Sequence, residues 1–231
     1  MQIHGLNKTT LLDYPEHVAA TVFTGGCNFR CPFCHNGDLV LHPGSYPVIS
    51  EEEVFAFLKK RKGVLSGVCI TGGEPTLQPD LYTFIKKIKD LGYLVKLDTN
   101  GYRPDVLAKL LEDGLLDYVA MDIKHSREKY KIATDVSEID ISLIEKSVEL
   151  LKQSSIEYEF RTTVLRQLHE REDFVAIGQW LAGAKAYYLQ AYRDNENVIR
   201  REFTAYEKEE MEDFVRLLAP FVERVALRGM D

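Results

Sequence analysis

The feature that most restricts the fold of this sequence is a regular alternation. From Ala19 onward, short runs rich in β-branched residues alternate with longer amphipathic stretches of helical period. This pattern is typical of repeated βα units around a parallel sheet. We predict six strands, at residues 20–23, 67–70, 94–99, 117–123, 157–164 and 186–190. The sequence therefore predicts an α/β fold of parallel strands with outer helices.

A helix candidate follows each predicted strand. The first begins after Ser50, where Glu53 completes a capping-box pattern. The third begins at Pro104 and ends at Gly114, as helix-terminus preferences favour. The others are predicted near residues 81–91, 141–153, 170–181 and 206–218. Because no internal repeat or interdomain linker interrupts the series, we expect residues 1–231 to form one domain. Two long loops, 35–50 and 191–205, are functional candidates.

Charge and hydropathy exclude two classes of partner. The formal net charge of −7 gives no electrostatic reason to expect nucleic-acid binding, which depends on basic side chains meeting phosphates. No stretch approaches the roughly 18 consecutive apolar residues that a membrane span requires. The first residues also lack the basic-then-apolar pattern of a signal peptide. We therefore expect a cytoplasmic protein that binds neither nucleic acid nor membrane.

Three of the four cysteines lie within the eight residues of "CNFRCPFC", at Cys27, Cys31 and Cys34. Disulfides within so short a loop would be strained and would leave an odd thiol, so metal binding is the better interpretation. A structural zinc site favours four protein ligands. Three thiolates instead suffice for a 4Fe-4S cluster with one iron left open for a substrate. Cys69, in a strand-like run, is predicted to be a buried structural residue.

The spacing C-x3-C-x2-C, with an aromatic residue before the last cysteine, resembles the motif of the radical S-adenosylmethionine (radical SAM) enzymes. The segment "TGGEP" after the second predicted strand strengthens the resemblance. On its own, the TGGEP segment favours a simple turn between a strand and a helix. Beside the cysteines, its glycines favour close approach of the backbone to a ligand. The resemblance covers nearly the whole chain and implies a partial (β/α)6 barrel, with one 4Fe-4S cluster per chain on the three cysteines.

The resemblance also implies a set of SAM-binding residues. The amino group of SAM would bind at Gly72, Gly73 and Glu74. Two further segments, "LDTNG" and "AMDIKH", end predicted strands, where parallel barrels place their active sites. They resemble segments of the glycyl radical enzyme activating enzymes, which implies a monovalent-cation site and contacts to SAM at positions Asp98, Thr99, Asp122, Lys124 and Arg161. Without the resemblance, a helix-capping role for Asp98 and a structural ion pair for Arg161 remain open.

The branch of the family that the chain resembles most contains the compact activators of anaerobic ribonucleoside-triphosphate reductase. In that branch a reduced cluster splits SAM into methionine and a 5′-deoxyadenosyl radical, which removes a hydrogen atom from a glycine of the partner enzyme. The resemblance also implies a small electron donor such as flavodoxin or ferredoxin.

Three alternatives stay open. The chain could activate pyruvate formate-lyase or another glycyl radical enzyme, although Tyr192 replaces a histidine of the pyruvate formate-lyase activators. It could be a radical SAM enzyme acting on a small molecule. It could also be a noncatalytic zinc-binding module.

Overall fold

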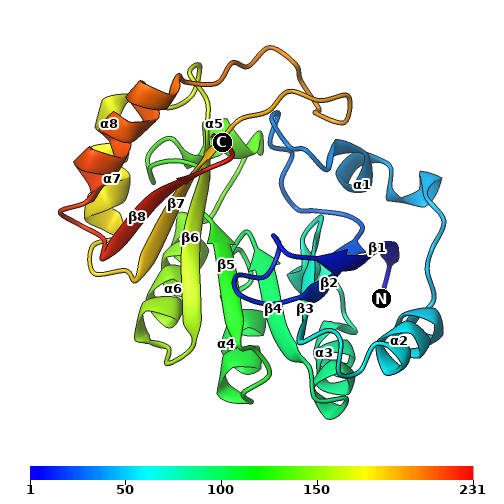
Figure 1. The fold of residues 1–231 in the computed structure, drawn as a ribbon. Helices are drawn as coiled ribbons and strands as arrows, with labels where there is room; N and C mark the ends of the chain where they lie inside the picture. Colours follow the sequence, from blue (N-terminus) through cyan, green and yellow to red (C-terminus); the bar gives the residue numbers. More distant parts are fainter. Residues whose placement is uncertain (231) are drawn as a thin grey trace.

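The computed structural model of the chain describes residues 1–230. One sheet of eight strands runs through it in sequence order, and the helices lie along its outer side (Figure 1). The strands are β1 (Ile3–Thr10), β2 (Ala19–Thr24), β3 (Gly67–Gly72), β4 (Leu94–Thr99), β5 (Tyr118–Asp122), β6 (Glu157–Val164), β7 (Ala186–Ala191) and β8 (Arg224–Arg228). No pairing joins β1 to β8 within this part of the chain, so the sheet is an open, partial barrel, as expected.

All six predicted strands are present, as β2 to β7, but the prediction missed both edges of the sheet. β1 pairs with β2 in antiparallel orientation, so the sheet is not wholly parallel. β8 extends the parallel series beyond β7. Both edge strands are partly exposed and carry polar residues, which hides the alternation that marks a half-buried strand. The fold class is confirmed, with two strands more than the sequence predicted.

The six predicted helices are all found, with small differences at their ends. They are α2 (Glu51–Lys60), α3 (Leu81–Asp90), α4 (Pro104–Glu112), α6 (Ile141–Gln153), α7 (Arg171–Trp180) and α8 (Lys208–Leu218). Ser50 caps α2 through the backbone N–H of Glu53, which is one half of the predicted capping box. Two short helices, α1 (Gly37–Leu41) and α5 (Tyr130–Thr134), were not predicted. No helix of residues 1–230 combines the length and apolarity that a bilayer crossing would require.

Strand alternation separates an apolar layer from a polar interior. On β4, Val95 and Leu97 are fully buried in the apolar core between sheet and helices. Lys96 and Asp98 occupy the opposite face, inside the partial barrel, where they pair with each other. On β6, Glu159 and Arg161 alternate in the same way with core residues. The concave side of the sheet therefore carries charged layers that lead up to the carboxyl ends of the strands.

Two long segments meet at that end of the sheet. The cysteine segment follows β2, and the segment between β7 and α8 crosses above it (Figure 1). The backbone N–H of Arg200 donates to the carbonyl of Pro32 at 2.8 Å, and Phe203 packs edge-on against Phe33. The predicted loop 35–50 contains α1 and a short 3-10 turn, Pro43–Ser45. These contacts cover the cysteine segment on its outer side.

Candidate active site

One cavity at the carboxyl ends of the strands collects every site residue that the sequence predicted. The lining includes Cys27, Cys31, Cys34, Gly72, Gly73, Glu74, Asp98, Thr99, Asp122, Lys124 and Arg161. These residues come from the ends of β3 to β6 and from the loop after β2. They meet because parallel strands bring their carboxyl ends to the same edge of a sheet.

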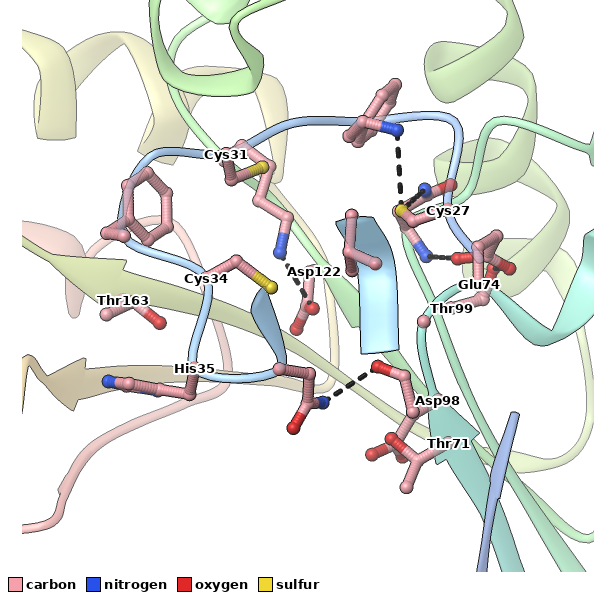
Figure 2. Close-up of a pocket in the computed structure, with 18 of the residues that line it drawn as sticks. Cys27, Cys31, Cys34, His35, Thr71, Glu74, Asp98, Thr99, Asp122 and Thr163 are labelled. Atoms are coloured by element: carbon pink, nitrogen blue, oxygen red, sulfur yellow. Dashed lines mark hydrogen bonds and ion pairs between the residues drawn. The ribbon is translucent and has the colours of Figure 1, made fainter. Parts of the chain in front are cut away.

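The three cysteines form one wall of this cavity. Their sulfur atoms point inward from the loop, toward the space beside Asp122 (Figure 2). Cys31 is buried, while Cys27 and Cys34 are partly accessible. The backbone N–H of Phe29 donates to the Cys27 sulfur at 3.3 Å. The loop thus presents three thiols to one space, as the C-x3-C-x2-C spacing predicted.

The protonation of these thiols follows from their burial. Burial raises the pKa of Cys27 to about 11 and that of Cys31 to about 12. Burial also raises the pKa of Cys34. Without metal the thiols are neutral at pH 7, so ligation must release their protons. No three His, Cys, Asp or Glu side chains of residues 1–230 converge closely enough to hold a single metal ion. Three separated thiols fit a multi-iron cluster better than one zinc ion.

An unpaired polar atom beside the cysteines also fits a cluster. The side-chain Nδ2 of Asn28 is buried and has no hydrogen-bond partner. Its amide lies next to Cys27, since Asn28 Oδ1 is 3.9 Å from the Cys27 sulfur. Asn100 Nδ2 donates to Asn28 Oδ1 at 2.8 Å and lies 3.8 Å from the same sulfur. Such N–H donors suit the sulfur atoms of an iron–sulfur cluster.

The two glycines of the GGE segment are required by the packing of the protein backbone. A Cβ atom on Gly73 would lie 1.9 Å from the carbonyl oxygen of Gly26. Gly72 has φ +113°, and its Cβ would lie 2.4 Å from the backbone of Thr24. Gly73 N–H donates to Thr24, and Glu74 N–H donates to Gly26, each at 2.8 Å. This contact fixes the GGE segment against the chain just before Cys27.

Glu74 is almost fully buried and connects the GGE segment to the end of β4. Its Oε1 accepts hydrogen bonds from Thr99 Oγ1 at 2.8 Å and from the N–H and hydroxyl of Thr76. Its Oε2 accepts one from the N–H of Asn100 at 2.7 Å. Burial raises the pKa of Glu74, although these hydrogen bonds favour the carboxylate. Glu74 therefore places a carboxyl group in the cavity wall and holds the wall together.

Opposite Glu74, five charged side chains of alternating sign lie across β4 to β6. Asp98 pairs with Lys96 and, at 3.2 Å, with Arg161. Arg161 also pairs with Asp122 at 3.0 Å, and Asp122 pairs with Lys124 at 2.9 Å. Three cations and two anions leave this charge network with a formal charge of +1. Arg161 thus lines the cavity and is also the structural ion-pair residue that the sequence left open.

The network fixes the ionisation of its members. Burial alone would raise the pKa of Asp122, but Arg161 and Lys124 bring it down to about 2. Arg161 and Lys96 likewise hold the pKa of Asp98 below its ordinary value. Asp122 in turn raises the pKa of Lys124 and Arg161 despite their burial. These shifts keep Asp98, Asp122, Lys124 and Arg161 charged at pH 7.

Sequence reasoning missed two residues of this site. Asn100 lines the cavity. Its position directly after Thr99, at the end of a strand, is the sequence feature that could have indicated this. Lys96 lies one layer below the cavity under Asp98, and only 2% of its side chain is exposed. Its position two residues before Asp98 places both on one strand face, but nothing local shows that this face is enclosed.

Tyr192 does not line the cavity. It is buried beneath the ring of His35, which stacks on it with centroids 5.8 Å apart. His35 lies at the mouth of the cavity and hydrogen-bonds to the carbonyl of Arg193 at 2.8 Å. Tyr192 also packs edge-on against Phe203, which contacts the cavity residue Phe33. Its difference from a histidine therefore reaches the site indirectly, through His35 and through Phe203.

Comparison with known proteins assigns the class. The family model described as the radical SAM superfamily matches residues 21–181. The chain therefore belongs to the radical SAM superfamily, whose enzymes use a 4Fe-4S cluster and SAM. A full-length relative from Methanocaldococcus jannaschii, provisionally named a glycyl-radical enzyme activating enzyme, is 30% identical over 99% of this chain and 96% of its own length. This match confirms the resemblance to the activating-enzyme branch.

Other relatives match smaller parts or the fold alone. The pyruvate formate-lyase-activating enzyme of Clostridium pasteurianum is 34% identical over 58% of this chain and 57% of its own length. The structure of Streptococcus suis SuiB bound to S-adenosylmethionine aligns with 88% of this chain at TM-score 0.67 and 13% identity. This chain spans about half of SuiB, 48% of its length. The partial-barrel fold is thus shared with SuiB. The zinc-module alternative loses its support because the family model places the chain in the radical SAM superfamily.

Proposed function

We propose that this protein activates a glycyl radical enzyme, and that its partner is anaerobic ribonucleoside-triphosphate reductase. When bound, the cluster supplies the single electron that cleaves SAM, which leads to removal of a hydrogen atom from the partner's glycine. The observation that carries the proposal is a cavity with three thiols on one wall and oppositely charged groups on two others. The full-length relative supports the glycyl radical class.

The charge distribution fits the amino-acid end of SAM. An α-amino acid carries an ammonium group and a carboxylate a few bonds apart. The buried carboxylate of Glu74 lies on one side of the cavity, and the charge network of net +1 lies on the other. Arg161 and Lys124 can receive the carboxylate, while Glu74 and the backbone of Gly72 and Gly73 can receive the ammonium. Such fixed charges orient a bound molecule without reorganisation.

The chain would hold one cluster, on Cys27, Cys31 and Cys34. The fourth cysteine, Cys69, is fully buried on β3 and lies 3.9 Å from both Lys96 and Asp98. It has no cysteine neighbours with which to bind a second cluster. Free thiols and an iron–sulfur site suit a reducing compartment, so the proposal includes a cytoplasmic location and a flavodoxin or ferredoxin as electron donor.

Activation of pyruvate formate-lyase is the second candidate, supported by the partial match to the Clostridium pasteurianum activator. Anaerobic incubation of the cluster-loaded protein with SAM, dithionite and each candidate partner distinguishes the two. We expect the doublet of a glycyl radical in electron paramagnetic resonance (EPR) spectra only with the reductase. A doublet only with pyruvate formate-lyase would transfer the proposal to that partner. SAM cleavage without a radical on any glycyl radical enzyme would contradict the proposed class of activity.

A further inference from the structure

Lys96 gives the charge network a buried positive charge below the cavity. Strand pairing places it opposite Cys69 of β3 and Tyr118 of β5, one layer beneath Asp98. Its ammonium contacts Asp98 Oδ1, lies 3.9 Å from the Cys69 sulfur and lies 5.9 Å from the centre of the Tyr118 ring. Among residues 1–230 its one ion-pair partner is Asp98. Lys96 therefore acts on the cavity through Asp98.

Each carboxylate oxygen of the network already faces a cation of the protein. The two oxygens of Asp98 face Lys96 and Arg161. Those of Asp122 face Arg161 and Lys124. The third expected oxygen donor, the hydroxyl of Thr99, points its hydrogen bond to Glu74. A hard alkali ion needs several oxygen ligands at once, and here it would have to share each carboxylate oxygen with an ammonium or guanidinium group. The Thr99 oxygen also accepts a hydrogen bond from the N–H of Gly101 at 3.1 Å.

The charge balance also opposes a further cation. The network already has one positive charge more than it has negative charges, and its members are mostly buried. A fourth cation would meet three fixed cations and only two fixed anions at short range, where water screens weakly. The residues Asp98, Thr99 and Asp122 therefore do not fit the monovalent-cation site that the family resemblance implied.

From this geometry we infer that Lys96 is a positioning residue that replaces an alkali ion. Its ammonium balances the inner oxygen of Asp98, so the outer oxygen holds Arg161 toward the cavity without a bound Na⁺ or K⁺. SAM binding by this protein is therefore independent of alkali ions. The inference rests on the proposed function, because it concerns the same SAM-binding cavity.

The test compares SAM affinity in anaerobic buffers that contain choline, sodium or potassium chloride at equal ionic strength. Equilibrium dialysis of cluster-loaded wild-type protein should give the same Kd in all three. Lys96→Met should weaken binding in choline by about tenfold or more, and Na⁺ or K⁺ should restore most of the loss, because the vacated space exposes the Asp98 oxygen. Lys89→Met is the matched control, since Lys89 pairs with Asp117 away from the cavity, and it should behave as wild type.

A second variant covers the case in which Lys96→Met does not fold. Lys96→Met/Asp98→Asn removes both partners, so no carboxylate is left unpaired. Its SAM affinity should be reduced equally in all three buffers. Wild-type affinity that requires an alkali ion, or a stoichiometric alkali ion found by elemental analysis after exchange into choline, would overturn the inference. A folded Lys96→Met variant whose SAM affinity is the same with and without alkali ions would also overturn the inference. A double variant whose SAM affinity changes with alkali ions would do the same. Wild-type protein that binds no SAM in any buffer would instead refute the proposed function.

Discussion

Removal of the charge at Asp122 should destabilise the metal-free protein by an amount that the structure predicts. The carboxylate pairs with Arg161 at 3.0 Å and Lys124 at 2.9 Å, and its pKa lies at about 2 against an ordinary value of 3.8. Through proton linkage this difference corresponds to about 2 kcal/mol at pH 7. We therefore expect Asp122→Asn to lower the free energy of unfolding by about 2 kcal/mol at that pH.

The pH dependence of this effect has a definite sign. The pKa of Asp122 is lower in the folded state than in the unfolded state, so its stabilisation is complete above about pH 5 and decreases as the pH falls. About half should remain near pH 3. Urea unfolding followed by circular dichroism, at several pH values between 7 and 3, measures the gap between wild type and variant. Asp90→Asn, which removes an exposed partner of Lys86, should cause little change at any pH.

Two results would refute the reasoning about Asp122. A loss below about 0.5 kcal/mol at pH 7 would mean that the two ion pairs contribute no more than surface pairs do. If the difference in unfolding free energy between wild type and variant stays constant down to pH 3, the lost stability comes from packing and not from ionisation of Asp122. In the cluster-loaded protein the same variant should bind SAM more weakly at unchanged iron content, because Arg161 and Lys124 lose the group that orients them.

Three further substitutions, one of them with a matched control, test other parts of the site. Cys31→Ala should abolish cluster assembly and deoxyadenosine formation, since two thiolates hold a cluster poorly; normal SAM cleavage would contradict the site. Gly73→Ala should lower Tm by about 5 °C or more, because the new Cβ meets a backbone oxygen at 1.9 Å. Gly44→Ala, which meets nothing within 4 Å, should be nearly neutral. Asn100→Ala should make the cluster potential more negative in an EPR-monitored redox titration, because the Cys27 sulfur loses a donor at 3.8 Å. An unchanged potential would remove Asn100 from this role.

The predicted site residues that line the cavity share one property. Each lies in a short motif or at the carboxyl end of a strand, as do Glu74, Asp98 and Asp122. Local pattern locates the strand ends, and the rules of parallel topology then bring those ends together. The placement of these residues in one cavity therefore required only the order of strands and helices.

The residues that were missed depend on contacts across the sheet. Lys96 lies in an apolar run, where a lysine is expected to reach solvent. It is buried because the sheet curves around its inner face and Asp98 supplies its counter-charge. The edge strands β1 and β8 are defined by their neighbours and not by their own composition. The burial of Lys96 and the position of the edge strands depend on how all the strands assemble into one curved sheet. The sequence of a single segment does not encode that assembly.

The hydrogen bonds of the GGE segment also couple the two halves of the site. Gly73 and Glu74 bind the backbone just before Cys27, while the Glu74 side chain binds Thr99 and Asn100 at the end of β4. The cysteine loop and the wall that we propose to bind SAM are thus parts of one hydrogen-bonded frame. Electron transfer into a bound sulfonium requires a fixed separation between cluster and SAM. Because Glu74 joins both sides, its loss should disturb cluster and SAM binding together, whereas loss of Asp122 should disturb SAM binding alone.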